Sequence, residues 1–382
     1  MTIGHYVAHW SKGGLENYVR RLATTQVEAR HAVTMLKLSG VPGIDGAGEV
    51  TVTDSGPALA AAARDLDVLH LHYAVAPEVY DVVPGIRTLH VHTSYCPSGK
   101  KFLARAGQPC DRPYNRLTCL ASHVTQRCGS LKRANLRRLF GQTRHDYDAR
   151  DRAYWHAISS FQVEWLRRTG YPKDRTRLIL HAGPEPRAVT LPPAEGIPRF
   201  AFVGRLSKVK GADWLLRSLA HTTAPLHLDV VGDGELSGRL PTLAEELGIM
   251  DRVTFHGWVE PGDVAGIVAQ ARAVLAPSLW PEPAGLTALE AGANGRAFVA
   301  SAAGGFLDSV VDGETGLLVP PGDDVALASA LDCLANDYDF AVRLGKAGRD
   351  RVAHGFRWAE HVAAMDALYA EAVENHRAKA NR

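Results

Sequence analysis

The chain has 382 residues, enough for about two domains of ordinary size. Its hydrophobic fraction of 46% and charged fraction of 22% are typical of a globular protein and exclude an intrinsically disordered one. A net charge of +2 at pH 7, without interleaved aromatic and basic residues, argues against a nucleic-acid partner. There is no signal-peptide pattern and no stretch of about 18 apolar residues. We therefore expect a cytoplasmic protein.

The first half of the chain alternates short apolar runs with helical patterns. It opens with a run ending near Val7, a loop with Gly13 and Gly14, and apolar residues at helical spacing from Leu15 to Leu22. Further strands are expected at residues 31–38, 67–74, 87–94 and 154–160. Such alternation predicts a parallel sheet covered on both faces.

A Pro- and Gly-rich stretch at residues 181–198 predicts a linker, after which the alternation restarts. Strands are expected at 199–204, 226–232, 253–257, 273–278 and 297–301, with helices at 211–220, 238–248, 263–271 and 285–295. We predict two doubly wound domains, 1–185 and 186–357, facing each other across a cleft. The amphipathic segment 358–382 is expected to be a helix that packs back on the first domain. Ligands of such sheets bind at the carboxyl ends of the strands.

Two cations follow the first strand of the second domain. In "FVGRLSKVKG" a strand ends, a glycine turns the chain, and Arg205 and Lys210 come before the next helix. Cations at this place suit a phosphate or diphosphate. Taken alone, the pair could equally be two surface cations in a loop.

The stretch "PEPAGLTALEAG" (281–292) holds two carboxylates that flank a turn and a helix start. Amides near Gly285, Leu286 and Thr287 are expected to point outward at the helix N-terminus, where phosphate oxygens bind. Glu282 and Glu290 could accept hydrogen bonds from hydroxyl groups, because a carboxylate is an acceptor only. A helix N-terminus that favours acidic residues would explain Glu282 but not Glu290, which lies in a largely apolar segment.

The order and spacing of these segments resemble the glycosyltransferase family 4 members of the GT-B class. The resemblance rests on Gly13–Gly14, "GRLSKVKG" (204–211), "VVGDGE" (230–235), "FHGWV" (255–259), the pair Glu282 and Glu290, the glycines at 304–305, and "DGETGLLVPPGD" (312–323). It runs through both halves and is more specific in the second. One departure is "LHAGPEP" at the end of the first domain, where family members often have an Asn-Gly turn.

The resemblance implies a retaining transferase that uses a nucleotide-activated sugar, with UDP- and GDP-sugars as the candidate donors. Arg205 and Lys210 would then hold the donor diphosphate, Glu282 the sugar hydroxyls and Glu290 the ribose. Amides of Gly285, Leu286 and Thr287, and those of Gly13 and Gly14, would line the phosphates. His92 lies where such enzymes place a histidine near the donor sugar, although as a residue it could equally be a buried strand histidine.

The same resemblance implies no cofactor for the chemistry and leaves the acceptor open, as a sugar-containing compound or another small molecule. An epimerase or a phosphorylase of the same fold, and a non-catalytic nucleotide-sugar-binding protein, are the alternatives. The basic segment 132–152 is expected to form a helix of the acceptor-binding domain. Its cations could meet an anionic acceptor or a membrane surface, or form a solvated helix face.

Four of the five cysteines, Cys96, Cys110, Cys119 and Cys128, fall within one segment of the first domain. No C-x2-C pair occurs, so zinc spacing is not evident. The cluster could hold a structural zinc ion, form disulfides, or consist of free thiols. Histidines also alternate at 70, 72, 90 and 92 on two expected strands. Each pair would share one face of the sheet, where a zinc site or hydrogen bonding could satisfy them.

Overall fold

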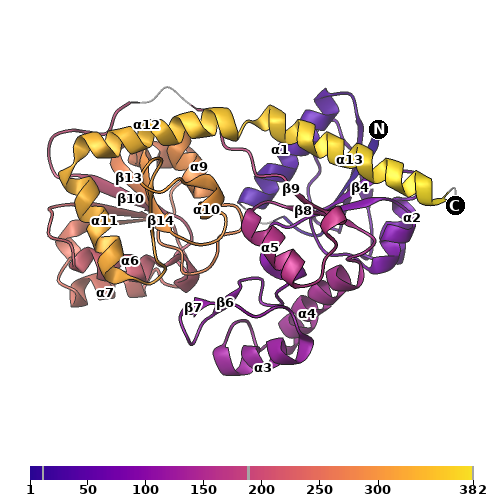
Figure 1. The fold of residues 1–382 in the computed structure, drawn as a ribbon, viewed down its shortest axis with the longest axis horizontal. Coiled ribbons are helices and arrows are strands. Elements are labelled where there is room, and N and C mark those ends of the chain that lie inside the picture. Colours follow the sequence, from indigo (N-terminus) through magenta and orange to yellow (C-terminus); the bar gives the residue numbers. More distant parts are fainter. Residues whose placement is uncertain (11–12, 187–189, 381–382) are drawn as a thin grey trace. The chain divides into compact units, whose positions relative to one another are not determined.

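A computed structural model describes residues 1–10, 13–186 and 190–380, and the chain divides into two compact units. The first unit is Met1–Lys101, Asp111–Leu180 and Ala359–Arg382, and the second is Phe102–Cys110 and His181–Trp358. The sequence-based prediction was 1–185, 186–357 and 358–382, and it did not separate residues 102–110 from the first domain. Each unit is an α/β structure in which helices cover a parallel sheet (Figure 1).

The sheet of the first unit has the strand order β3-β2-β1-β4-β5-β8-β9, with every neighbouring pair parallel. Its strands are β1 (Thr2–Val7), β2 (Ala32–Lys37), β3 (Gly48–Thr51), β4 (Val68–Leu71), β5 (Gly85–Thr88), β8 (Tyr154–Ala157) and β9 (Thr176–Leu178). The chain winds outward from β1 in one direction and then from β4 in the other. The switch point therefore lies between β1 and β4.

The sheet of the second unit repeats this winding, in the order β12-β11-β10-β13-β14-β15, again all parallel. Its strands are β10 (Arg199–Val203), β11 (His227–Val231), β12 (Val253–Gly257), β13 (Ala271–Ala276), β14 (Ala297–Ser301) and β15 (Leu317–Val319). Its switch point lies between β10 and β13. A small antiparallel hairpin, β6 (Phe102–Leu103) with β7 (Gln108–Pro109), also belongs to this unit.

The helices of the first unit connect its strands and cover the sheet. They are α1 (Gly14–Glu28), α2 (Pro57–Ala62), α3 (Arg116–Gln126), α4 (Arg133–Asp148), α5 (Ser160–Arg168) and α13 (Trp358–Ala380). Short 3-10 turns lie at η1 (Pro77–Asp81), η2 (His92–Ser94) and η3 (Lys173–Arg175). The last helix, α13, buries Met365, Leu368 and Tyr369 against the strands of the first unit.

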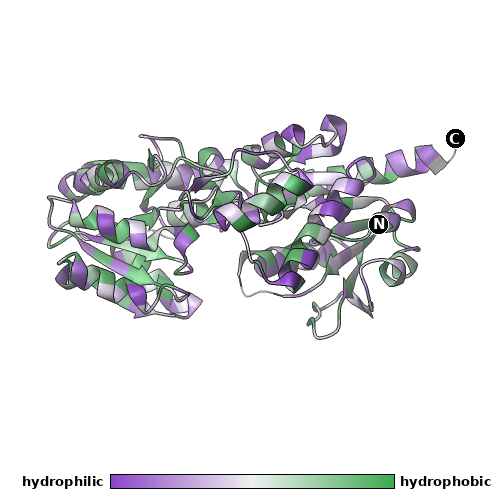
Figure 2. Cartoon of the chain, turned by 90° about the horizontal axis from the view of Figure 1, so that it is seen from below, coloured by the Kyte–Doolittle hydropathy of each residue, from purple (hydrophilic) through white to green (hydrophobic). Residues whose placement is uncertain are grey.

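The helices of the second unit are α6 (Ala212–Ala220), α7 (Arg239–Glu246), α8 (Pro261–Gln270), α9 (Leu286–Ala293), α10 (Phe306–Ser309), α11 (Asp324–Asn336) and α12 (Tyr338–Gly355), with 3-10 turns η4 (Lys208–Lys210) and η5 (Met250–Arg252). Their apolar faces pack on the central strands, as Leu215 of α6 and Leu331 of α11 do against Phe200 and Leu275. Figure 2 shows hydrophobic residues along the strands and a mixture of hydrophobic and hydrophilic residues on the helices. In the described part of the chain, no helix combines the length and apolarity needed to cross a membrane.

Both doubly wound sheets were predicted, and the strands of the second unit lie within a few residues of their expected places. One strand of the first unit was misplaced. Residues 87–94 were expected to be extended, but β5 ends at Thr88 and His92 begins the 3-10 turn η2. The edge strands β3, β9 and β15 were not predicted, because each has only three or four residues and too little alternation to be recognised.

Candidate functional site

The loops after β10 and β13 meet at the switch point of the second sheet. The first loop carries Arg205 and Lys210, and the second carries Glu282 and leads into α9. Leu279 N donates a hydrogen bond to Val209 O at 2.8 Å, which ties the two loops together. Seven of the sequence-predicted site residues therefore lie on two adjoining loops and the helix that follows them.

Glycines allow this close approach of backbone to backbone. A Cβ atom at Gly211 would lie 1.8 Å from Pro277 O, and one at Gly232 would lie 1.9 Å from Gly204 O. Gly211 also has φ 72°, in the left-handed region that side chains disfavour. Gly211 of "GRLSKVKG" and Gly232 of "VVGDGE" are thus needed because a side chain at either position would collide with the backbone of Pro277 or Gly204.

Glu282 is the centre of this site. Its Oε1 atom accepts hydrogen bonds from Lys210 Nζ at 2.7 Å, Ser278 Oγ at 2.5 Å and Trp280 Nε1 at 2.8 Å. The residue is only 8% exposed, so its carboxylate is held in one orientation by three donors. Its second oxygen, Oε2, has no hydrogen-bond partner among the described residues and remains able to accept from a ligand.

The sequence identified Lys210 and Glu282 as separate contributors, and the structure adds that they form an ion pair. It also adds Ser278 and Trp280, which sequence reasoning missed. Both precede Glu282 in "PSLWPEP", directly after β13. A hydroxyl and an indole N–H at the end of a central parallel strand are the signal that could have identified them.

Arg205 differs from Lys210 in having no partner. It follows β10 directly, its side chain is exposed, and its guanidinium has no hydrogen bond within the described residues. An unpaired guanidinium presents planar donors that suit a carboxylate or a phosphate. The site therefore offers one cation paired with a carboxylate and one available for an anion.

The N-terminus of α9 lies at the end of the second loop. Gly285 caps this helix with φ 68°, without a side-chain acceptor, so the first-turn amides of Leu286 and Thr287 lack intrahelical partners. The turn is held from the other side by the glycine pair at 304–305, since Gly305 N donates to Glu282 O at 2.7 Å. Amides and helix dipole together make this terminus suited to an anion.

Glu290 lies further along α9 and is exposed. Desolvation by the surrounding protein raises the pKa of its carboxyl, and the positive charge of Lys210 lowers it in part. Because the side chain keeps contact with water, we treat the carboxylate as ionised at neutral pH. The electrostatic effect of Lys210 links Glu290 to the same group of charges as Glu282.

The remaining predicted site residues belong to the first unit. Gly13 precedes α1 and Gly14 is its first residue, after residues 11–12, which lie outside the described part. His92 is fully buried, and its Nδ1 lies 2.5 Å from Tyr95 Oη. The structure describes these residues by themselves within the first unit, whereas Arg205, Lys210, Glu282, Gly285 and Glu290 are brought together in the second.

All five cysteines are free thiols, so the disulfide alternative for the segment 96–128 is not what the structure shows. Cys128 is buried, with Sγ 3.4 Å from His123 Nδ1, and Cys96 Sγ lies 3.1 Å from Ser98 Oγ. Within the described ranges, the cysteines do not form a group of three potential metal ligands. A three-ligand group does occur at His5, His70 and His72, of which the sequence named the last two.

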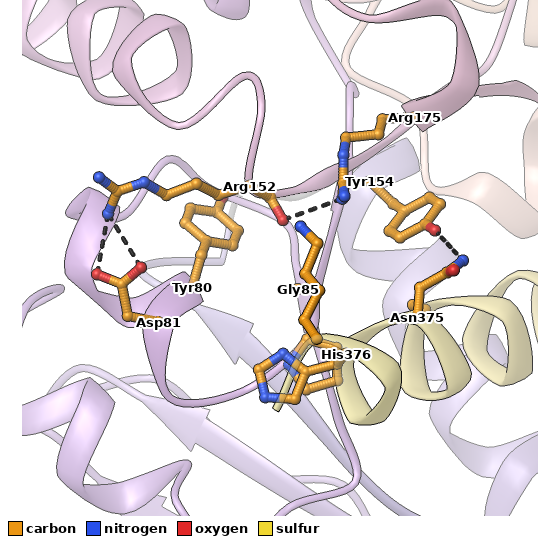
Figure 3. Close-up of a pocket in the computed structure, with 11 residues that line it drawn as sticks. Tyr80, Asp81, Gly85, Arg152, Tyr154, Arg175, Asn375 and His376 are labelled. Carbon is orange, nitrogen blue, oxygen red and sulfur yellow. Dashed lines mark hydrogen bonds and ion pairs between the residues drawn. The ribbon is translucent and has the colours of Figure 1, made fainter. Parts of the chain in front are cut away.

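A surface cavity of about 340 Å³ lies in the first unit, and none of the predicted site residues lines it. It opens at the amino ends of β5 and β8, beside Gly85 and Tyr154 (Figure 3). Arg152 in its wall pairs with Asp81 at 2.9 Å, and Asn375 Nδ2 donates to Tyr154 Oη at 2.6 Å. Parallel α/β sheets bind their ligands at the opposite, carboxyl edge, so this cavity is not part of the candidate site.

Comparison with protein families identifies the second unit. Residues 190–351 match the family "Glycosyl transferases group 1". This match covers the loops after β10 and β13 and all of α9. The matched residues lie within the second unit, which is therefore similar to this family over most of its length.

Curated relatives match over the same half of the chain. A D-inositol 3-phosphate glycosyltransferase of Corynebacterium glutamicum is 36% identical over 186 residues, which are 46% of this chain and 44% of the relative. The protein of the same name from Nocardia farcinica is 38% identical over 200 residues, 49% of this chain and 44% of the relative. The chain thus spans less than half the length of the curated relatives it matches.

Solved structures resemble the whole chain. Sucrose-phosphate synthase from Thermosynechococcus elongatus superposes with a TM-score of 0.71 at 24% identity, over 97% of this chain and 98% of that one. Anabaena Alr3699/HepE, solved in complex with UDP and glucose, superposes with a TM-score of 0.71 at 17% identity, over 97% and 100%. These likenesses confirm the predicted GT-B fold.

Proposed function

We propose that the protein is a retaining glycosyltransferase that moves a sugar from a UDP- or GDP-sugar to a hydroxyl group of an acceptor. The observation that carries this proposal is the candidate site of the second unit. There, the Lys210–Glu282 pair, Arg205 and the uncapped first-turn amides of α9 follow the carboxyl ends of β10 and β13. This one place thus offers hydrogen-bond donors for phosphate groups and hydrogen-bond acceptors for the hydroxyls of a sugar and of a ribose.

Each part of the donor has a proposed partner. The diphosphate is bound by Arg205, Lys210 and the amides of Gly285, Leu286 and Thr287, because these groups supply positive charge and N–H donors. Glu282 accepts hydrogen bonds from sugar hydroxyls through Oε2, and Glu290 accepts them from the ribose. Gly13, Gly14 and His92 of the first unit are proposed to contact the phosphates and the sugar as the donor binds.

The cations are proposed to act mainly in the transition state. As the sugar–phosphate bond breaks, the sugar gains oxocarbenium character and negative charge grows on the departing diphosphate. Arg205 and Lys210 stabilise that charge, and the leaving phosphate oxygen takes the proton of the attacking hydroxyl on the same face of the sugar. This route retains the anomeric configuration and requires neither a carboxylate nucleophile nor a metal cofactor.

The known proteins narrow the choice of substrates to test. D-inositol 3-phosphate is an acceptor candidate from the names of the relatives, and UDP-glucose is a donor candidate from the solved complexes. An anionic acceptor would be compatible with the basic helix α4 of the first unit. We propose a cytoplasmic location, with peripheral membrane contact through this basic surface if the acceptor is a lipid.

A calorimetric screen of nucleotides and nucleotide sugars, followed by transfer assays, tests the function. We expect UDP- or GDP-sugars to bind, and sugar transfer to be lost in Lys210→Ala and Glu282→Ala with the fold intact by circular dichroism. Wild-type turnover in either variant would contradict the assigned roles. An inverted anomer in the product, seen by NMR, would contradict the retaining mechanism.

Two alternatives have the same fold and would give different results in these assays. An epimerase would change the sugar of the nucleotide sugar without an acceptor, and a phosphorylase would release sugar phosphate with inorganic phosphate. A non-catalytic binding protein would bind the nucleotide sugar and return it unchanged. Arg205 and the Lys210–Glu282 pair would serve each of these proteins, because each binds a diphosphate, so the assay products decide among them.

A further inference from the structure

A row of polar side chains crosses the sheet of the first unit on one face. His5 of β1 stands beside His70 of β4, and Thr88 of β5 stands beside His156 of β8, because these pairs are in register in parallel strands. All four are fully buried. His72 lies two residues beyond His70 on the same face.

Two helices complete the row. Gln26 of α1 and Tyr369 of α13 are both fully buried, and Gln26 Nε2 donates to Tyr369 Oη at 3.1 Å. Tyr369 Oη also lies 2.8 Å from His70 Nδ1, and Gln26 Oε1 lies 2.7 Å from His5 Nε2. Both helices are therefore joined to the sheet through polar contacts in its interior.

The position of each proton follows from one end of the row. His156 Nε2 lies 2.9 Å from Ile179 O, a carbonyl that can only accept, so Nε2 carries a proton. Burial lowers the pKa of His156 to about 3, so the ring is neutral at pH 7. Its Nδ1 is then unprotonated and can only accept a hydrogen bond. Thr88 Oγ1, at 2.8 Å, must then donate to Nδ1.

The same logic fixes the next three bonds. Because Thr88 has used its only hydrogen, His70 Nε2 donates to Thr88 Oγ1 at 2.6 Å. His70 is also kept neutral by burial, which lowers its pKa, so His70 Nδ1 accepts from the hydroxyl of Tyr369. Tyr369 Oη in turn accepts from the amide of Gln26.

In the other direction the row leads to His90. Gln26 Oε1 accepts from His5 Nε2, which leaves His5 Nδ1 as an acceptor for His72 Nε2 at 3.1 Å. His72 Nδ1 then accepts from His90 Nε2 at 3.0 Å. All eight hydrogen bonds from His90 to Ile179 run in one direction, and each neutral ring donates through Nε2.

We propose that these eight side chains, which we call the histidine row, have a single proton arrangement and form a pH-operated latch that holds α1 and α13 on the sheet of the first unit. The inference is independent of the proposed transferase activity. A proton added to an accepting nitrogen turns that acceptor into a donor. It then faces another donor, so the bond is lost and the latch opens.

The surroundings of the histidine row give an added proton little compensation. Both ring nitrogens of His5, His70, His72 and His156 are already used, and none bonds to a carboxylate.

The other titratable or charged groups whose effects reach the histidine row are Arg87 of β5, Tyr18 of α1, and His361 and Asp366 of α13. Arg21 of α1 acts on His361. Arg87 is cationic and lowers the pKa of His72 and His90 further. The only carboxyl in this set, Asp366, acts on the Tyr369 hydroxyl and not on an imidazole.

A bound metal ion is the competing explanation. The ligand atoms of His5, His70 and His72 all lie within 4.8 Å of one another. A divalent ion needs lone pairs, however, and both nitrogens of His70 are already engaged by Tyr369 and Thr88. Metal binding would therefore require the hydrogen bonds that define the histidine row to break.

The first test reads the protons directly by NMR of histidine-¹⁵N-labelled protein at pH 7. We expect His5, His70, His72, His90 and His156 to be neutral, protonated on Nε2, with slowly exchanging ring protons. An imidazolium ion or an Nδ1–H tautomer at any of the five would overturn the proposal. A rise in melting temperature on adding Zn²⁺ would overturn it as well, in favour of a metal site.

The second test changes the proton count with a nearly isosteric variant. On unfolding, the five histidines of the row should together take up about 4.5 protons near pH 5.5, because unfolded histidines titrate near 6.5 and the buried rings are neutral. In Gln26→Glu the new carboxylate cannot donate to Tyr369, so the folded variant should hold one proton more than the folded wild type. The proton uptake on unfolding should therefore fall by about one.

The matched control is Gln270→Glu, the same substitution at an exposed position at the end of α8. The uptake is obtained from the pH dependence of urea unfolding, followed by hydrogen-exchange mass spectrometry of α13 peptides. Equal uptake in wild type, Gln26→Glu and the control would overturn the latch. Reduced uptake in Gln26→Glu alone would support it.

Discussion

The two units share a topology but place their polar groups in opposite regions. In the second unit, Phe200, Leu228 and Leu275 share one core, and the groups of the candidate site follow the strand ends. The buried Asp229 of β11 is an exception within its strands, and it is paired with Arg199 and His256. In the first unit, histidines lie within the strands and are buried. A doubly wound sheet therefore tolerates a polar interior, provided that every buried donor and acceptor finds a partner.

The difference also separates groups available to a ligand from groups engaged in the fold. Arg205 and the Oε2 atom of Glu282 lack partners in the described chain, which makes them suited to a ligand. The ring nitrogens of His5 and His70 are all used by neighbouring side chains, which makes them structural. Four experiments would sharpen or break this contrast.

Acidification should affect the two units unequally. Burial holds the pKa of His5 at about 4 and that of His156 at about 3, below the 6.5 of an ordinary histidine. The folded state thus binds fewer protons, so stability is complete above about pH 6.5 and falls as the pH drops toward these values. At pH 5 each of the two should cost the first unit about 2 kcal/mol.

Hydrogen-exchange mass spectrometry at pH 7 and pH 5, corrected for intrinsic exchange rates, would measure this loss in each unit. Peptides of β1, β4 and α13 should lose protection, while peptides of β10 and β13 keep it. Equal losses in both units would show that the buried histidines are not the cause.

Removing one cation should reduce activity without affecting stability. For Lys210→Ala we expect kcat/KM to fall about 100- to 1000-fold, because stabilisation of the leaving group is lost. Lys208→Ala, an exposed lysine of the same turn, should remain within about threefold of wild type and serves as the control. Similar losses in both variants would point to a general effect of the loop instead.

Two tyrosine-to-phenylalanine variants compare a hydroxyl of the histidine row with a hydroxyl of the second unit. Tyr369→Phe would leave His70 Nδ1 and the Gln26 amide without a partner in a buried site, at a cost of about 1–3 kcal/mol in unfolding free energy. Tyr338→Phe removes one hydrogen bond, to Pro192 O in the second unit, and should cost about 1 kcal/mol. Urea melts would detect the difference, and equal costs would mean that the row adds nothing beyond single bonds.

The smallest effect is expected at Glu290. In Glu290→Gln, one of the two carboxylate oxygens that we propose to accept from the ribose is replaced by an NH2 group. The KM for the nucleotide sugar should therefore rise up to about tenfold, with kcat nearly unchanged. Glu314→Gln, in an exposed turn of the same unit, is the matched control. A fall in kcat without a change in KM would place Glu290 nearer the reacting atoms than proposed.

Much of the second unit could be predicted from the sequence because its functional groups follow strands with strong apolar runs. "GRLSKVKG" begins where β10 ends, and "PEPAGLTALEAG" follows the end of β13 after the short stretch "PSLW". The parallel topology then brings Lys210 and Glu282 together. The hydrogen bonds from Ser278 and Trp280 could not be predicted, because they depend on the path of a loop rather than on a periodic pattern.

The first unit was less predictable. The sequence indicated that His70 and His72 share a face, but His5 lies in another strand and meets them only through the register of β1 with β4. The contact with Tyr369 joins positions 299 residues apart. The end of β5 was missed because "RTLHVHTS" keeps its alternation beyond Thr88, where the hydrogen-bonded ladder stops.

Because all hydrogen bonds of the histidine row run in one direction, the substitutions that its residues can accept depend on one another. Each hydrogen bond polarises the next in the same sense, so the energy of one member depends on the presence of the others. Double-mutant cycles between His5 and Thr88, which do not touch each other, should therefore give a non-zero coupling energy. Sequence variation at these positions is expected to be concerted, with the row kept whole or replaced as a block by apolar residues.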